Sequence, residues 1–126
     1  MLIEELLISL AKNRINYERL NRLIGEEISA SISAQNYTGG SNIPVDYLEL
    51  AYEWKRCDED NFYYQHHDGD IEAYLSSKCQ HALNAHRLIQ ERKEARKQYG
   101  IAKARVTRLS NRLYQGHLDQ PKNQLN

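Results

Sequence analysis

Residues 85–113 read AHRLIQERKEARKQYGIAKARVTRLSNRL, and this stretch decides the fold. One stripe of mostly apolar or small side chains recurs at spacings of three and four through four heptads, at Ala85, Leu88, Arg92, Ala95, Tyr99, Ala102, Val106, Leu109 and Leu113. This period predicts a helix that packs a narrow seam against another helix. The stripe crosses Gly100 without a change of phase. A continuous helix is therefore favoured over a break at Tyr99-Gly100, because a glycine inside a helix costs only about 1 kcal/mol.

The helix is expected to extend upstream, because a slightly offset stripe precedes it at Ile71, Leu75, Cys79, Ala82 and Ile89. We therefore predict one long helix over about 71–114. A partner helix is predicted over about 2–33, with its own seam at Ile3, Leu6, Leu10, Asn13, Tyr17, Leu20 and Ile24. Asn13 interrupts this seam. It either fixes the register of the pair or reaches water at the edge of a bundle.

The middle of the chain is expected to hold a shorter helix. Residues 37–42 read YTGGSN, which is turn chemistry, and Pro44 is suited to the first turn of a helix over about 45–60. The sequence thus predicts an all-α protein, an elongated helical hairpin or small bundle of about three helices with coiled-coil character. We expect one domain over residues 1–116 and a polar tail over 117–126. Because each seam is narrow, a homodimer could cover apolar surface that the monomer leaves open.

The bulk composition indicates a small polar protein. The chain has 126 residues, 40% of them hydrophobic, and a mean hydropathy of −0.78. No apolar run approaches the roughly 18 residues of a membrane span. The first residues include Glu4 and Glu5 and no basic stretch, so a signal peptide is not expected. With only Cys57 and Cys79, a disulfide framework is not expected, and the reducing cytoplasm is the predicted compartment.

The charges cancel overall and are sorted by position. The chain has 17 Lys and Arg against 17 Asp and Glu, yet residues 46–72 are strongly acidic and residues 78–112 strongly basic. At about 100° per residue, one ridge of cations falls opposite the seam of the last helix, formed by Arg87, Lys93, Lys97, Arg105, Arg108 and Arg112. Such a ridge suits phosphates or an acidic protein surface. The alternative is a solvated face, or an internal partner for the acidic segment.

Aromatic side chains gather in the acidic segment, at Tyr47, Tyr52, Trp54, Phe62, Tyr63 and Tyr64. Tyr and Trp are common at interface hot spots, and spaced carboxylates can imitate a nucleic-acid backbone. The alternative is that Tyr47, Trp54 and Phe62 belong to the core and that the acids face water.

Catalytic, metal and cofactor sites are not expected. The cysteines and histidines that could meet, Cys57, His66, His67, Cys79, His81 and His86, lack the spacing of a structural zinc site. Residues 68–72 read DGDIE, but this stretch lacks the later ligands of a calcium loop. No phosphate-binding loop or nucleophile motif is present. We therefore do not expect an enzyme.

Residues 85–105 resemble the basic C-terminal helix of short helical accessory proteins encoded by phages and prophages. Proteins of this size and origin commonly inhibit host machinery, anti-CRISPR and anti-restriction proteins among them. The resemblance implies a phage or prophage origin and a non-catalytic protein with a host defence or nucleic-acid-handling complex as its protein partner. It assigns no functional residue.

The leading interpretation is therefore a non-catalytic interaction protein that binds and inhibits a host nucleic-acid-handling complex. The expected contact residues are Tyr52, Trp54, Asp58, Glu59, Asp60, Arg96, Lys97, Arg105 and Arg108. A second interpretation is a nucleic-acid-binding accessory protein that contacts DNA or RNA through Lys93, Lys97, Arg105, Arg108 and Arg112. A third is a structural coiled-coil adaptor.

Overall fold

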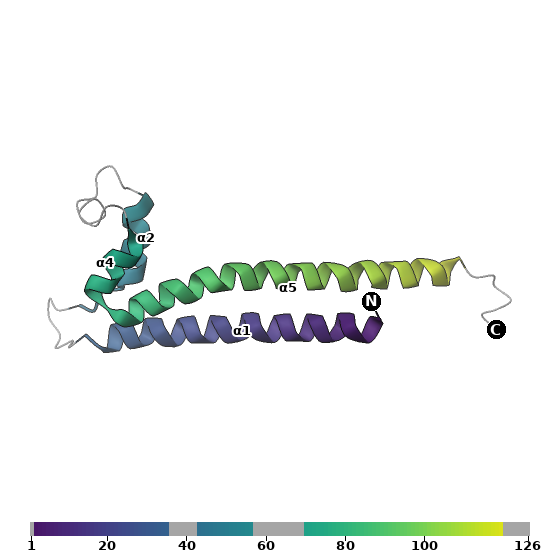
Figure 1. Cartoon of the computed structure of the whole chain (residues 1–126), viewed down its shortest axis with the longest axis horizontal. Coiled ribbons are helices and arrows are strands. Elements are labelled where there is room, and N and C mark those ends of the chain that lie inside the picture. The colour runs from purple at the N-terminus through teal and green to yellow at the C-terminus, as the bar shows by residue number, and fades with distance from the viewer. Residues whose placement is uncertain (1, 36–42, 57–69, 120–126) are drawn as a thin grey trace. The chain divides into compact units, whose positions relative to one another are not determined.

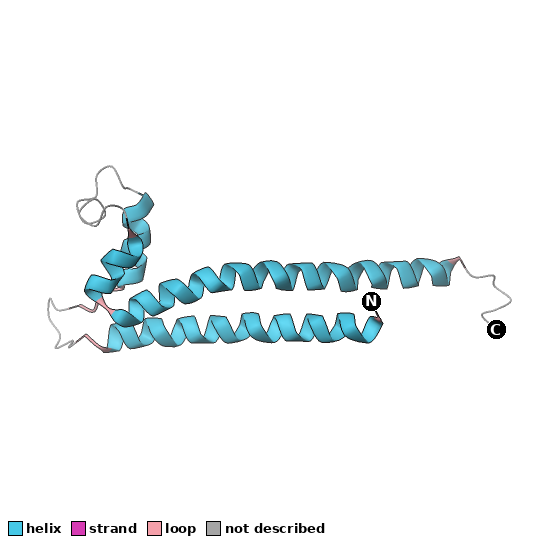
Figure 2. Cartoon of the chain, viewed as in Figure 1, coloured by secondary structure: helices cyan, strands magenta, loops and turns pink. Residues whose placement is uncertain are grey.

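The chain is all-α over the residues that the structure describes. The computed structural model describes residues 2–35, 43–56 and 70–119, with the side chains of 54–56 outside this set. These ranges form helices α1 (Ile3–Ser33), α2 (Tyr47–Arg56), α4 (Ile71–Lys78) and α5 (Gln80–Leu118) and contain no strand (Figures 1 and 2). The predicted all-α class is confirmed. Within these ranges, no helix has both the length and the apolar character that crossing a membrane requires.

The helices pack into two compact units, each described by itself below. Unit 1 comprises Met1–Glu18 and Lys93–Asn126, and unit 2 comprises Arg19–Arg92. Helices α1 and α5 each contribute to both units, whereas α2 and α4 belong to unit 2 alone. The prediction of one domain over residues 1–116 stays a prediction.

In unit 1, the start of α1 packs antiparallel to the later part of α5. The Tyr17 and Tyr99 rings lie 5.9 Å apart between centroids, and Ala95 and Ala102 are buried. Small residues at these two seam positions let the helices approach closely. Asn13 is half-buried, and its Nδ2 donates to the Ser9 carbonyl oxygen at 2.8 Å, inside its own helix. This bond satisfies the amide without a partner on α5.

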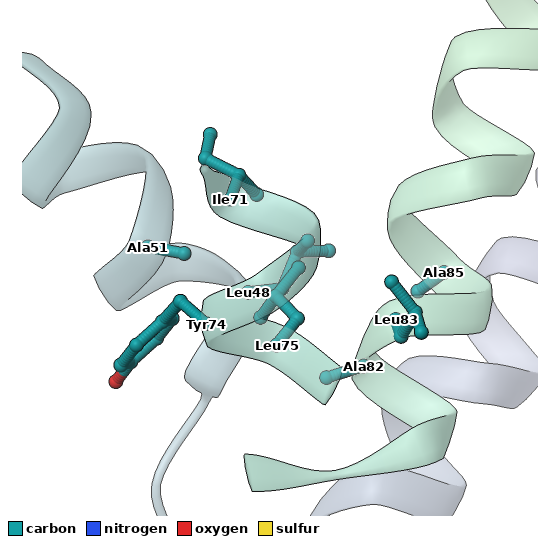
Figure 3. Close-up of a cluster of buried hydrophobic side chains, with 8 residues drawn as sticks. All are labelled: Leu48, Ala51, Ile71, Tyr74, Leu75, Ala82, Leu83 and Ala85. Carbon is teal, nitrogen blue, oxygen red and sulfur yellow. The ribbon is translucent and has the colours of Figure 1, made fainter. Parts of the chain in front are cut away.

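In unit 2, the core lies where α2, α4 and the first turns of α5 meet. Leu48 and Ala51 come from α2, and Leu75, which is fully buried, comes from α4 (Figure 3). The remaining members of the cluster are Ile71, Tyr74, Ala82, Leu83 and Ala85. Ile28, from the last turns of α1, packs against the cluster. Most of the buried apolar side chains thus belong to unit 2, which makes it the better-packed of the two units.

The predicted single helix over 71–114 is wrong at its start, because the chain turns at Cys79. Cys79 is extended, with φ −162° and ψ 126°, and ends α4 through a bond from its N–H to the Leu75 carbonyl. Its own carbonyl accepts from the N–H of Leu83 at 3.1 Å, so the same residue opens α5. The described residues therefore form four helices, where the sequence predicted about three.

The other helix limits differ by smaller amounts. Helix α2 begins at Tyr47 rather than near residue 45, because the Asp46 carboxylate accepts the N–H of Glu49 at 3.1 Å and caps the first turn. The predicted helix over 45–60 is seen over 47–56, and residues 57–60 lie outside the described residues. Helix α5 passes through Gly100, as the unbroken stripe predicts, and continues to Leu118, inside the expected tail over 117–126. Residues 120–126 lie outside the described set.

Candidate interaction surface

The charges are divided between the two units. Unit 1 carries ten Lys and Arg against five Asp and Glu, a net charge of +5. Unit 2 carries seven Lys and Arg against twelve Asp and Glu, a net charge of −5. The neutral chain is thus built from a basic and an acidic packing unit. A field of this kind can orient a charged partner at the approach stage.

The basic ridge of α5 is exposed in unit 1. Lys93, Lys97, Arg105, Arg108 and Arg112 all have exposed side chains. No described carboxylate forms an ion pair with Lys97, Arg105, Arg108 or Arg112. Arg87, which the sequence placed on the same ridge, belongs to unit 2, where its Nε lies 2.9 Å from Glu72 Oε1. At Arg87, the ridge therefore pairs with the acidic segment of its own chain, which was one of the alternatives for these cations.

Three of the ridge arginines gather around a hollow between α5 and α1. The hollow has a volume of about 240 Å³ and is lined by Leu6, Arg105, Arg108, Leu109 and Arg112. The arginines sit at positions i, i+3 and i+7 of α5, which places them on one helix face. Leu6 and Leu109 add an apolar floor from the two facing seams. This combination of guanidinium groups and leucines is the most distinctive surface feature of unit 1.

Arg96 lies on the opposite flank of α5 and is engaged inside unit 1. Its Nη2 donates to the Tyr17 hydroxyl at 3.2 Å, and its guanidinium lies 5.8 Å from the centroid of that ring. Lys103, on the same flank, places its Nζ 4.4 Å from the centroid of the Tyr99 ring. These cation–π contacts join the two helices at a partly exposed site. Arg96 thus serves packing, whereas Lys97, Arg105 and Arg108 face outward.

Tyr52 is turned toward the core of unit 2. Its side chain is half-buried against the core cluster, and its hydroxyl lies 2.8 Å from His86 Nδ1 in a hydrogen bond. Burial raises the pKa of the Tyr52 phenol, and the charge of Arg92 and the Gln90 side chain offset this only in part. Tyr47 also packs against the cluster, as the core alternative expected.

The other predicted contact residues in this region cannot be placed. Trp54 lies in α2 with its side chain outside the described set, and Asp58, Glu59 and Asp60 lie outside the described residues.

A second hollow of about 390 Å³ in unit 2 has charges of both signs in its lining, including Glu26, Glu27, Arg87 and Glu91.

Cys79, where α4 ends and α5 begins, carries a thiol with a lowered pKa. Burial alone would raise the pKa of this thiol, but hydrogen bonds from Ser31 and from the backbone N–H groups of Ala82 and His81 outweigh burial, so the pKa lies below its usual value. The two amides belong to the first turn of α5, where a helix favours an anion. The change of direction between α4 and α5 at Cys79 was visible in the sequence only as an offset between the apolar stripes before and after residue 79. Among the described residues, no three Cys, His, Asp or Glu side chains gather as metal ligands.

Comparisons with family models, with curated proteins and with solved structures found no match to this chain.

Proposed function

We propose that this chain is a non-catalytic interaction protein that binds the acidic surface of a protein partner through the basic face of α5. The observation that carries the proposal is the exposure of Lys97, Arg105, Arg108 and Arg112, which form no ion pair with a described carboxylate, and the position of the three arginines around one hollow. Guanidinium groups bind carboxylates in a bidentate fashion, and a +5 unit steers an acidic partner toward this face.

A protein partner fits this face better than nucleic acid does. Phosphates would satisfy the arginines, but they offer nothing to cover Leu6 and Leu109 in the same hollow. Between Lys93 and Arg112 the one aromatic residue is Tyr99, whose ring packs against Tyr17 and is not free to stack on bases. A protein surface supplies both acidic and apolar groups. The basic ridge is also a better-supported contact than Tyr52, whose hydroxyl is already bonded to His86.

The class of partner follows from the resemblance of residues 85–105 to phage and prophage accessory proteins. We propose that the partner is a nucleic-acid-handling complex of a bacterial host and that binding inhibits it. The proposal requires no catalytic group, because occupying a surface is enough to block a complex.

The pairing of α1 with α5 gives the basic face its support. In unit 1, Ala95 and Ala102 are buried while Glu94, Arg96 and Lys103 beside them on α5 are exposed, which is the burial pattern of a coiled-coil seam. We propose that α1 and α5 pair in this way within each unit, and that the chain forms a helical hairpin. Such a hairpin holds the arginines of one helix on a rigid support.

The proposal is tested by affinity capture from bacterial lysate with matched variants. The charge-reversal variant K97E/R105E/R108E should lose stoichiometric protein partners that the wild-type chain retains. Arg14→Glu is the control, because Arg14 is also an exposed cation of unit 1 but lies on α1. Partners retained equally by both variants, or the absence of any stoichiometric partner, would contradict the proposal.

Nucleic-acid binding remains the second candidate, favoured by the length of the ridge. Lys97 and Arg112 are separated by 15 residues of continuous helix, about 22 Å at 1.5 Å per residue, enough to contact several phosphates. This candidate predicts duplex DNA affinity that falls steeply between about 50 and 200 mM salt. A mobility-shift assay at low salt, with the same three proteins, decides between the candidates.

A further inference from the structure

In unit 1, the seam of α5 extends beyond the N-terminal end of α1. Tyr17 contacts Tyr99, and Leu6 shares a hollow with Leu109, so the antiparallel register is continuous. By this register α1 begins, at Ile3, about level with residue 112 of α5. Figure 1 shows α5 running on past the N-terminal end of α1. The last turns of α5 therefore carry seam residues that no described segment of unit 1 covers.

The exposure of the seam residues changes at this point. Ala102 is 4% exposed, whereas Leu113, the last residue of the same stripe, is 58% exposed. Leu113 follows Leu109 by four residues on the same helix face, so it extends the apolar floor of the hollow instead of standing alone on the surface.

This apolar end adjoins the arginine hollow. Arg112 precedes Leu113 directly, and Arg105, Arg108 and Arg112 line the hollow with Leu6 and Leu109. The hollow of about 240 Å³ is smaller than the roughly 300–1,000 Å³ of small-molecule pockets, so it suits one or two apolar side chains of a macromolecule. The surface as a whole offers an apolar stripe with a cationic edge.

The cationic edge argues against two occupants from this chain itself. Pairing this end of α5 with the same end of a second copy would set three arginines against three others, and like charges in contact are costly. Residues 120–126 read QPKNQLN, so folding this segment back would bring no acidic side chain to the arginines. In neither of these two arrangements do carboxylates meet Arg105, Arg108 and Arg112.

We propose that the C-terminal end of α5 receives an acidic amphipathic helix of the partner protein. This inference rests on the proposed function and names the partner segment of the same site. The apolar face of that helix covers Leu113 and places a side chain in the hollow, and carboxylates along its edge bind Arg105, Arg108 and Arg112. Residues 106–118 of α5 span about 20 Å, so a partner helix of three to four turns is long enough.

The experiment measures binding of labelled peptides to the full chain by fluorescence anisotropy. The probe is a fourteen-residue peptide with leucine at alternating spacings of three and four and glutamate at the flanking positions. A scrambled peptide of the same composition and charge is the first control. Because the leucines contribute only when they line one face, the amphipathic peptide should bind at least about tenfold more tightly than the scrambled one.

Three variants separate the hollow and its apolar floor from the overall charge of unit 1. Arg108→Glu should weaken peptide binding at least about tenfold, and Leu113→Ser should weaken it by a similar factor. Arg14→Glu is the matched control, because Arg14 is an exposed cation of unit 1 that lies on α1 outside the hollow, and it should change affinity less than about threefold. All three sites are exposed, so circular dichroism should show an unchanged fold.

The outcomes distinguish this inference from the proposed function. Equal binding of the two peptides, with both weakened by K97E/R105E/R108E, overturns the inference and leaves a general acidic partner. If neither peptide binds and the triple variant retains every captured partner, both fail. A doubled molar mass that Leu113→Ser abolishes identifies a second copy as the occupant and overturns the inference. Stronger competition by duplex DNA of equal charge than by the amphipathic peptide also overturns it.

Discussion

Replacing Gly100 by alanine should stabilise unit 1. Gly100 lies exposed inside α5, and a Cβ added there meets nothing within 4 Å. Alanine gains about 0.8–1.0 kcal/mol over glycine in a helix interior, because glycine loses more backbone entropy on folding. With no steric cost to subtract, we expect the free energy of unfolding to rise by about 1 kcal/mol.

Gly25 provides the matched comparison in the other unit. It lies inside α1, is exposed, and also has open space at the Cβ position, but it belongs to unit 2. Urea denaturation followed by circular dichroism at 222 nm should show midpoint shifts of about 0.3–1 M for each variant. If the units unfold separately, Gly100→Ala shifts one transition and Gly25→Ala shifts the other. If the chain is one cooperative domain, both variants shift a single transition.

A destabilising effect of Gly100→Ala would refute this reasoning. It would mean that Gly100 has a backbone conformation in solution that alanine does not tolerate, and therefore that α5 is not continuous there. The basic ridge would then be divided between two helices, with Lys97 on one and the three hollow-lining arginines on the other. The same variant, if it stabilises the chain, should leave peptide binding unchanged.

Four further tests concern side chains of unit 2. Tyr52→Phe should cost about 0.5–1.5 kcal/mol in thermal or urea unfolding, because the hydroxyl loses its bond to His86, and should leave partner capture unchanged. The raised pKa of the Tyr52 phenol stabilises the fold fully below about pH 10, and this contribution should be lost as pH rises through the folded-state pKa. In a Cys57→Ser background, Cys79 should react with iodoacetamide with a pH midpoint below 9.0, because its thiolate is stabilised in the native state; a midpoint at or above 9.0 contradicts this. Leu75→Ala should cost about 2–5 kcal/mol in urea unfolding, since the side chain is fully buried.

The helices were largely readable from the sequence because they depend on local periodicity. The stripe through residues 85–113 predicts α5 and its passage through Gly100, and the Asn-containing seam predicts α1. The turn at Cys79 was visible only as an offset between two stripes. Its cause is tertiary: α4 packs against α2 in the core of unit 2, so the chain must change direction before α5 begins.

The surface was predictable only in part, because angular position on a helix does not reveal its neighbours. The spacing of Arg105, Arg108 and Arg112 places them on one face, but the hollow exists because Leu6 of α1 lies beside them. Arg96 looked equivalent to Lys97 in sequence, yet a tyrosine of the opposite helix binds it. Such differences depend on the antiparallel register, which neither seam specifies alone.

The arginine hollow carries a stability cost that the described chain does not offset. Arg105 and Arg108 are three residues apart and Arg108 and Arg112 four apart, and each like-charged pair destabilises a helix by about 0.2–0.5 kcal/mol. Arg108→Gln removes both pairs with little change in helix propensity, so it should stabilise unit 1 by about 0.5–1 kcal/mol at low salt. The gain should shrink at 1 M salt, where screening weakens the repulsion. The same variant should bind the acidic peptide more weakly. A protein that keeps a local repulsion whose removal stabilises it retains the charges for a partner. If Arg108→Gln destabilises the fold instead, the Arg108 stem contributes to packing and the argument for a binding role loses this support.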